Sequence, residues 1–167
     1  MKVKEVMTGG PQACAPGASL AEAASLMWEH DCGVLPVIND ERRVVGMITD
    51  RDICFGATTK NRAPSEVTVG EVITGKVFAC GPDDDIHKAL KTMRRERVRR
   101  LPVVGEDGTL RGILSMNDVV LHAENGGGDK YHEITYGDVV KTYKAICEHA
   151  LLPQVAEGTG RRQAATA

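Results

Sequence analysis

Short apolar runs separated by polar turns occur in the second half of the chain, in an order that predicts two strands and a helix. Residues 101–104 form an apolar run that ends at a Gly-Glu-Asp-Gly turn, and residues 110–114 form a second run. Two runs of this length joined by an Asp-Gly turn are typical of a β-hairpin. Ser115 then precedes the apolar positions Val119 and Val120, as a residue that opens a helix would. The pattern therefore predicts strand, turn, strand and helix.

The same pattern occurs earlier in the chain, displaced by 66 residues. Residues 35–38 correspond to 101–104, and residues 44–52 correspond to 110–118. Further identical pairs at this spacing are Val6 and Val72, Thr8 and Thr74, Gly9 and Gly75, Cys14 and Cys80, Pro16 and Pro82, Ala23 and Ala89, and Met27 and Met93. Since chance would not keep one register over about fifty residues, the chain contains a tandem duplication.

We expect a mixed α/β fold of two βαββα-like repeats related by a pseudo-twofold axis, followed by a C-terminal helix. Each repeat should begin with a short helix and a short strand, the strands lying at 12–14 and 77–80. The capping box of Ser19 and Glu22 then opens a long helix that runs to about His30, and Trp28 beside its apolar face is expected to pack. A short helix should follow the first hairpin, from Asp50 to about Phe55.

These elements divide the chain into six segments. They are repeat 1 at 1–56, a linker at 57–66, repeat 2 at 67–123, a Gly-rich break at 124–134, a helix at 135–152 and a disordered tail at 153–167. Because folded units of about 60 residues are marginal on their own, the two repeats are expected to share one hydrophobic core.

Composition and charge narrow the function classes. The net charge of −2 argues against a nucleic-acid binder and against a membrane-surface protein. No apolar run approaches the ~20 residues of a membrane span, and the start of the chain lacks the apolar core of a signal peptide, so we expect a cytoplasmic protein. The arginines at 94, 95, 97, 99 and 100 lack the interleaved aromatic residues on which single-stranded bases stack, which also disfavours nucleic acid.

The spacing of the cysteines argues against a metal site, and the absence of known catalytic motifs argues against catalysis. Five cysteines, an odd number, favour free thiols in a reducing cytosol. Cys14 and Cys80 occupy equivalent strand positions and should be buried as small hydrophobic residues. Cys147 and His149 are the nearest approach to a metal site, but they lack the paired spacing of zinc ligands. No Gly-x-Ser-x-Gly, Walker or His-Glu-x-x-His motif is present, so we expect no enzyme.

The spacings Thr49-x-x-Asp52 and Ser115-x-x-Asp118 allow two interpretations. Each is a capping box variant, in which a hydroxyl and a carboxylate satisfy backbone groups at a helix start. Each also lies at a strand-to-helix turn, where free N–H groups and a hydroxyl suit a sugar or phosphate oxygen. The preceding strand carries a glycine at the same place in both repeats, which allows another backbone or a ligand to approach closely. The spacing alone does not decide between the two.

Taken together, the Leu-Pro-Val strand, the turn and the Gly-apolar-apolar-Thr/Ser-x-x-Asp segment, each present twice, resemble the CBS domain, which occurs in pairs as a Bateman module. The resemblance covers about residues 2–123. It implies a stand-alone, non-catalytic regulatory module without a cofactor, which senses AMP, ADP, ATP or S-adenosylmethionine in the cleft between the repeats. It further implies a homodimer that forms a flat disc, and an effector protein that the sequence does not identify.

The resemblance also assigns residues to two ligand sites. The residues of the first are Asp118, Ser115, Asn117, Arg99, Arg100, Thr8, Gly9, Gly10 and Pro11. The residues of the second are Asp52, Thr49, Arg51, Val34 and Val77. The aspartates would bind ribose hydroxyls, the arginine pair would hold phosphates, and the segment from Thr8 would support the base. The second site lacks the arginine pair and would take a less charged adenosine compound, or none.

Two alternatives to a nucleotide sensor stay open at this point. One is a ligand-free structural or protein-interaction module, whose carboxylates only cap helices. The other is a thiol- or metal-responsive stress protein that uses the cysteines.

Overall fold

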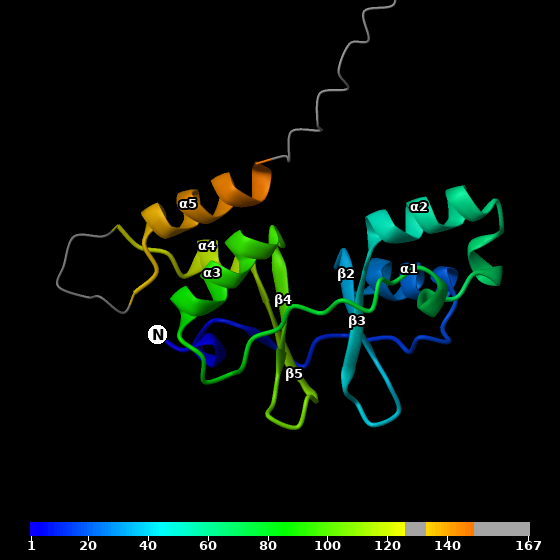
Figure 1. Ribbon diagram of the computed structural model, residues 1–167, viewed down its shortest axis with the longest axis horizontal. Helices are drawn as coiled ribbons and strands as arrows, with labels where there is room; N and C mark the ends of the chain where they lie inside the picture. The colour runs from blue at the N-terminus through cyan, green and yellow to red at the C-terminus, as the bar shows by residue number, and fades with distance from the viewer. Residues whose placement is uncertain (126–132, 149–167) are drawn as a thin grey trace, which may run out of the picture.

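The computed structural model describes residues 1–125 and 133–148. Two similar halves lie side by side, each with a β-hairpin and helices packed on it, and one more helix lies on the second half (Figure 1). The strands are β1 (Thr8–Gly9), β2 (Val34–Ile38), β3 (Val44–Thr49), β4 (Arg100–Val104) and β5 (Leu110–Ser115). The α-helices are α1 (Leu20–Glu29), α2 (Asp50–Lys60), α3 (Ile86–Glu96), α4 (Met116–Leu121) and α5 (Tyr136–Cys147). The 3-10 helices are η1 (Val3–Glu5), η2 (Pro64–Glu66) and η3 (Val69–Glu71).

Both predicted hairpins are confirmed. Strand β2 pairs antiparallel with β3, and β4 pairs antiparallel with β5. The register of each ladder shifts at the equivalent place, after Val37 in the first half and after Val103 in the second. The hairpin turns meet through a bridge between Arg43 and Thr109, which are themselves equivalent positions of the two repeats. This bridge therefore marks the pseudo-twofold axis of the molecule.

The short strands predicted at 12–14 and 77–80 do not form as strands. Each contributes a single parallel bridge, from Cys14 to Val37 and from Cys80 to Val103. A proline follows two residues after each cysteine, at Pro16 and Pro82. Because proline has no N–H to donate, the ladder cannot be extended past this point.

The capping boxes predicted at helix starts are confirmed, but α2 ends later than expected. Thr49 caps α2, and the helix continues to Lys60, so residues 57–60 belong to it and not to the linker. The hydroxyls of Thr58 and Thr59 donate to carbonyl oxygens one turn earlier, both at 2.7 Å. Asn61, at a φ of 50°, then ends the helix in the left-handed conformation. Residues 57–60 were assigned to the linker because they are mostly polar, although they form the last turn of α2.

The leading segment of each half packs into the opposite half. Helix η1 places Val3 in the core of the second half, and η3 places Val69 in the core of the first. At these equivalent positions, the Val3 N–H donates to the Asp84 carbonyl at 2.9 Å, and the Val69 N–H donates to the Ala18 carbonyl at 2.8 Å. The exchange is reciprocal, and the chain therefore crosses between the halves.

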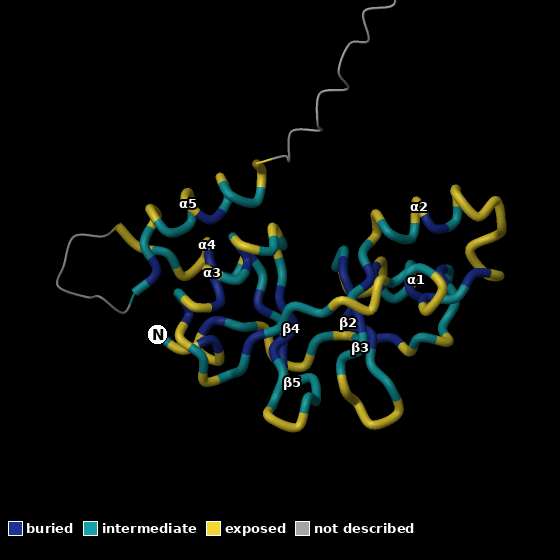
Figure 2. The backbone as a smooth tube through the Cα atoms, viewed as in Figure 1, coloured by how far each residue is buried: buried dark blue, intermediate teal, exposed yellow. Residues whose placement is uncertain are grey.

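Because of this exchange, the prediction of one shared core is wrong. The buried residues form two clusters, one in each half, as the dark blue segments of Figure 2 also show. The second-half cluster contains Val3, Val6, Cys80, Ile86, Ala89, Leu90, Met93, Leu101, Val103, Leu114, Met116, Val119 and Ile134. The first-half cluster contains Cys14, Leu20, Ala23, Met27, Leu35, Val37, Ile48, Val67 and Val69. Each half completes its own core with residues from the other.

Helix α5 forms the predicted additional helix and packs on α3 and α4. Ile134, just before this helix, and Thr142, within it, are fully buried. The N–H of Glu124 donates to the Ile134 carbonyl at 2.9 Å, so both ends of the predicted Gly-rich break are held in place. The glycines at 126–128 and the predicted helix end and tail at 149–167 lie outside the described residues. Within the described part of the chain, no helix could span a membrane.

Candidate functional site

The first candidate site is centred on the carboxylate of Asp118, at the junction of β5 and α4. Its Oδ2 accepts hydrogen bonds from the Ser115 backbone N–H at 2.7 Å and from the Ser115 hydroxyl at 2.6 Å. The Asp118 N–H donates back to the Ser115 hydroxyl at 3.2 Å. The capping interpretation is therefore correct, and one of the two carboxylate oxygens is used for it.

The other oxygen of Asp118 faces the opposite repeat. Its Oδ1 accepts a hydrogen bond from the Thr8 hydroxyl at 3.1 Å. Thr8 reaches this place because β1 pairs antiparallel with β5, with Thr8 opposite Ile113 and Gly9 opposite Gly112. The structure thus brings together the two parts of the site that the sequence separates by more than a hundred residues.

The arginine pair flanks the same junction. Arg100 lies opposite Ser115 in the hairpin ladder, and the Arg99 carbonyl accepts a hydrogen bond from the Met116 N–H at 2.9 Å. Arg99 is exposed and Arg100 is half-buried. Among the described residues, neither guanidinium has an ion-pair partner, so both remain available to an anion. Asn117 is exposed on the first turn of α4.

The glycine of β5 serves the approach of protein backbone. A Cβ atom at Gly112 would lie 2.6 Å from the Met7 sulfur and 2.9 Å from the Thr8 carbonyl oxygen. At the equivalent Gly46, a Cβ would lie 2.6 Å from the Ile73 Cδ1 atom. The sequence allowed the close approach of either another backbone or a ligand at these glycines, and the structure shows the approach of other segments of the chain.

The second candidate site, around Asp52, is built differently. Asp52 Oδ2 accepts from the Thr49 N–H at 2.9 Å and from its hydroxyl at 2.7 Å, which repeats the cap of the first site. Thr74, the counterpart of Thr8, instead accepts a hydrogen bond from the Lys76 N–H at 3.4 Å. Among the described residues, the sheet of this half contains β2 and β3 and no crossing third strand.

The remaining residues of the second site are only partly brought together. Val34 pairs with Thr49 across the hairpin. The guanidinium of Arg51 lies over the Phe55 ring, 5.3 Å from its centroid, and so packs along α2. Val77 is half-buried in the segment between η3 and α3, and its role stays a prediction. The two sites therefore differ in their contacts, and the predicted difference in their ligands stays a prediction.

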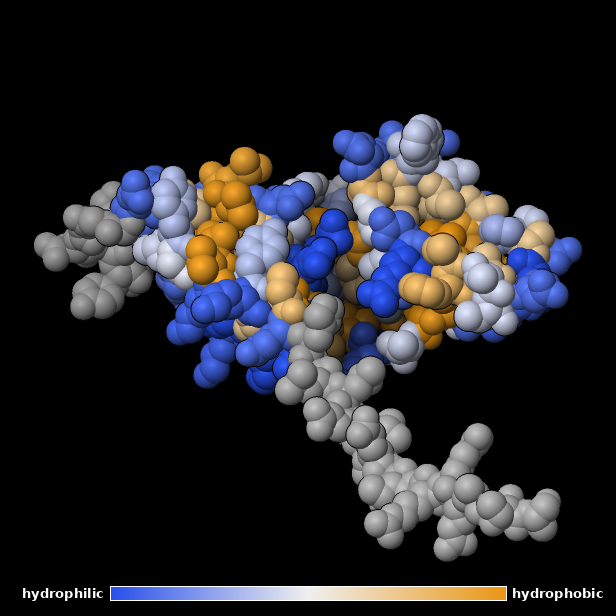
Figure 3. All heavy atoms as spheres, turned by 90° about the horizontal axis from the view of Figure 1, so that it is seen from above, coloured by the Kyte–Doolittle hydropathy of each residue, from blue (hydrophilic) through white to orange (hydrophobic). Residues whose placement is uncertain are grey.

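Seen from the helix side, the surface is hollowed between the two halves, with hydrophilic residues on both sides of the hollow (Figure 3). Two better-defined pockets lie elsewhere. One, of about 420 Å³, lies between α1 and α2 and is lined in part by Trp28. The other, of about 490 Å³, lies beside the loop of Asp83 and Asp84. The sequence did not indicate the first pocket, because Trp28, expected to pack, is 89% exposed.

The cysteines behave as small hydrophobic residues where they are buried. Burial raises the pKa of the Cys14 thiol to about 11 and that of the Cys80 thiol to about 12. They belong to different cores, and Cys147, the last residue of α5, is exposed. Within residues 1–125 and 133–148, no three His, Cys, Asp or Glu side chains lie close enough together to hold a metal ion.

Comparison with known sequences finds similarity along most of the chain. The family model described as CBS domain matches residues 3–56 and 69–125. Hypoxic response protein 1 of Mycobacterium tuberculosis is 31% identical over 144 residues, which cover 86% of this chain and 92% of that protein. The CBS domain-containing protein YhcV of Bacillus subtilis is 32% identical over 120 residues, 72% of this chain and 84% of that one.

Solved structures show the same architecture. Hypoxic Response Protein I, crystallised with two coordinated zinc ions, superposes with a TM-score of 0.67 at 32% identity, over 73% of this chain and 98% of that one. The CBS domain pair of protein MJ0100, in complex with methylthioadenosine and S-adenosylmethionine, gives 0.65 at 25% identity, over 72% and 98%. CBSX2 in complex with AMP gives 0.62 at 29% identity, over 72% and 93%.

Proposed function

Because the chain belongs to the CBS domain family and carries two such domains in tandem, we propose that it is a non-catalytic regulatory module that binds an adenosine nucleotide between its repeats. The observation that carries this proposal is the junction at Asp118. There a carboxylate of the second repeat, a hydroxyl of the first repeat and two arginines that form no ion pair with any described residue lie around one strand-to-helix turn.

Each group at this junction has a chemical role toward such a ligand. Asp118 Oδ1 accepts a hydrogen bond from the Thr8 hydroxyl at 3.1 Å and can accept hydrogen bonds from ribose hydroxyls in its place. The guanidinium groups of Arg99 and Arg100 carry a permanent positive charge and match phosphate oxygens in geometry. Gly10 and Pro11 directly follow β1 and would lie under the base. The relatives that hold S-adenosylmethionine, methylthioadenosine or AMP support this class of ligand.

The position of the site suggests how binding would be transmitted. Thr8 belongs to the leading segment of the first repeat, whereas Asp118 belongs to the second repeat, so a ligand that replaces their hydrogen bond acts on both halves. A difference in ligand affinity between two arrangements of the halves is what would shift the equilibrium between them. We propose that this shift, in an assembly of two copies of the chain, is read by an effector protein.

Thermal denaturation with AMP, ADP, ATP and S-adenosylmethionine tests the proposal. A ligand at 100 times its dissociation constant should stabilise the fold by about 2.7 kcal/mol. For a chain of this size, the melting temperature should rise by about 5–10 °C. No rise with any of the four compounds would refute nucleotide binding.

Titration calorimetry on Asp→Asn variants then locates the site. Asp118→Asn should weaken binding more than Asp52→Asn, because only the first site has the arginine pair and Thr8. Asp138→Asn is the matched control, since Asp138 caps α5 with the same Thr-x-x-Asp geometry away from the site. Arg99→Gln should weaken ATP binding more than S-adenosylmethionine binding, because only ATP carries phosphates. Equal loss in Asp118→Asn and Asp138→Asn would mean that the aspartates act only through stability.

A ligand-free interaction module is the second candidate, and one observation favours it. Asp52 and Asp118 both satisfy helix caps, which alone accounts for an aspartate at each position. In that case none of the four compounds would raise the melting temperature, and both Asp→Asn variants would change stability alone.

A further inference from the structure

The large hydrophobic side chains that are exposed in the described residues fall into two patches. The groove patch, on the first half, is the side chain of Trp28, which is 89% exposed; Phe55 of α2, 55% exposed, does not line the groove. The helix patch, on the second half, comprises Val120, Leu121, Tyr136 and Val140 on α4 and α5. Side chains of this size seldom remain in water in such groups unless another surface covers them.

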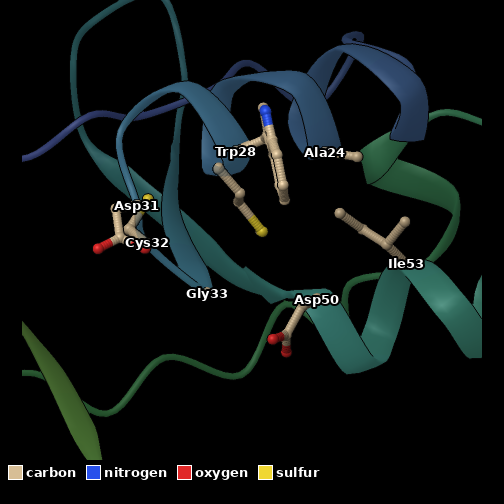
Figure 4. Close-up of a pocket in the computed structure, with 8 residues that line it drawn as sticks. Ala24, Trp28, Asp31, Cys32, Gly33, Asp50 and Ile53 are labelled. Carbon is tan, nitrogen blue, oxygen red and sulfur yellow. The ribbon is translucent and has the colours of Figure 1, made fainter.

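The groove patch borders a pocket that is open to solvent. Ala24 and Trp28 of α1 face Ile53 of α2 across it, and Asp31 and Asp50 lie at its rim (Figure 4). Its volume is about 420 Å³. The groove is thus apolar between the helices and acidic at one end.

The second half shows what this kind of groove accommodates. The repeat spacing makes Arg94 the counterpart of Trp28, and α3 and α4 the counterparts of α1 and α2. There the groove is filled by α5, whose Thr142 hydroxyl accepts a hydrogen bond from the Arg94 Nη1 at 3.0 Å. Val139, Tyr143 and Ile146 of α5 pack against the core below. The groove of one repeat therefore holds a helix, whereas its counterpart in the other repeat holds none of the described helices.

The outer face of α5 matches the open groove in polarity and charge. Tyr136 and Val140 are spaced by four residues and so lie on one side of the helix, where they are 52% and 58% exposed. Lys141 and Lys144, both exposed, lie on the same outer part of α5. These lysines are opposite in charge to the acidic rim of the groove.

We propose that α5 of a second copy of the chain docks by its outer face in the groove between α1 and α2. A two-fold axis makes this contact twice, since each copy offers one groove and one α5, and the assembly then closes at two chains. The lysines of one copy lie near the acidic rim of the other, and Trp28 is buried under Val140 of the second copy. This inference deepens the proposed two-copy assembly and does not depend on nucleotide binding.

Sedimentation of single variants provides the first test. The wild-type chain should sediment as a dimer. Trp28→Arg, which places in the groove the residue found at the counterpart position, and Val140→Asp should each raise the dissociation constant of the dimer at least roughly tenfold. Glu106→Lys, at the turn between β4 and β5 on the opposite side of the molecule, should leave it unchanged. Both mutated positions are exposed, so the melting temperatures of the monomers should stay close to that of the wild type.

Mixing the two variants tests the pairing itself. Trp28 is the only tryptophan in the chain, so the Trp28→Arg protein has no tryptophan fluorescence. It keeps an intact α5, whereas the Val140→Asp protein keeps an intact groove with its tryptophan. The mixture should therefore restore one contact, shift the tryptophan emission to the blue and protect it from acrylamide quenching. The Val140→Asp protein alone should show none of these changes.

The outcomes separate this inference from the broader proposal. A wild-type chain that stays monomeric at all concentrations would refute both the two-copy assembly and the docking of α5. A dimer that neither variant weakens would refute the docking alone. Variants that each weaken the dimer, with no recovery in the mixture, would show that the groove and α5 do not contact each other, and would also refute it.

Discussion

At the scale of single residues, carboxylates at helix starts organise this protein. Glu22, Asp52, Asp118 and Asp138 each accept hydrogen bonds from the backbone N–H and the hydroxyl of the capping residue three positions earlier. Asp118 differs from the others because its second oxygen also bonds to the opposite repeat. A ligand that uses this oxygen need not disturb the cap, so binding and helix stability can be separated at one side chain.

A different carboxylate should make stability depend on pH. Hydrogen bonds from Lys4 and Lys2 hold the pKa of Asp83 at about 2, below its ordinary value of 3.8. Because the pKa is lower in the folded chain, the stabilisation is complete above pH 3.8 and is lost as the pH falls toward about 2. Urea unfolding should show that Asp83→Asn is less stable than the wild type at neutral pH, and that the difference disappears within this window. A difference that stays constant down to pH 2 would contradict the assignment.

At the scale of elements, the leading segment crosses β5 in close contact near the site. Gly112 permits it, since any side chain there would meet both the Met7 sulfur and the Thr8 carbonyl oxygen. At Gly46 the nearest atom is the end of the Ile73 side chain, which can rotate away. The two glycines occupy equivalent positions but are not equally replaceable.

Gly112→Ala should therefore destabilise the fold by about 1–3 kcal/mol, and Gly46→Ala by less. The reason is that the Thr8 carbonyl belongs to backbone paired with β5 and cannot move without breaking that pairing. Chemical denaturation of both variants measures the difference. Because Thr8 would be displaced, Gly112→Ala should also weaken nucleotide binding, whereas Gly46→Ala should leave the first site intact. Equal destabilisation by the two substitutions would argue against a rigid crossing.

Elements determined by local sequence could be predicted, whereas those that depend on distant neighbours could not. The hairpins and helix caps follow from turn residues and from hydroxyl–carboxylate spacing within a few positions. The strands at 12–14 and 77–80 fail because a strand needs a partner along its whole length, and each finds only one bridge. That the segment from Thr8 lies at the Asp118 site was expected only through the family resemblance, and the hydrogen bond between Thr8 and Asp118 was not predicted. Nothing in the local sequence indicated that Trp28 would be exposed.

At the scale of the whole molecule, the two cores are separate but each is built from both repeats. The surface-to-volume argument correctly required the repeats to depend on each other. The same argument could not predict that the repeats exchange their leading segments, because the length of a repeat does not determine the path of the chain. The arrangement makes each half incomplete without the other.

The protein should consequently unfold in one transition despite having two cores. Val3→Ala and Val69→Ala, which remove buried side chains from opposite cores, should each shift that single transition to lower temperature. Calorimetry checks this, since the calorimetric and van't Hoff enthalpies should agree. Two resolved heat-absorption peaks, with each variant moving only one of them, would contradict the coupling.

The exchanged leading segments also bear on the origin of the chain. In a polypeptide with a single repeat, the apolar leading segment would have no core to pack into. The core of that repeat would also lack the residues that complete it. Two identical copies could each lend the segment to the other, around the axis now marked by Arg43 and Thr109. The present molecule then corresponds to such a swapped pair, in which the two copies are joined end to end through the segment that follows α2. Two fragments produced by cleavage between α2 and η2 should therefore reassociate into the folded molecule.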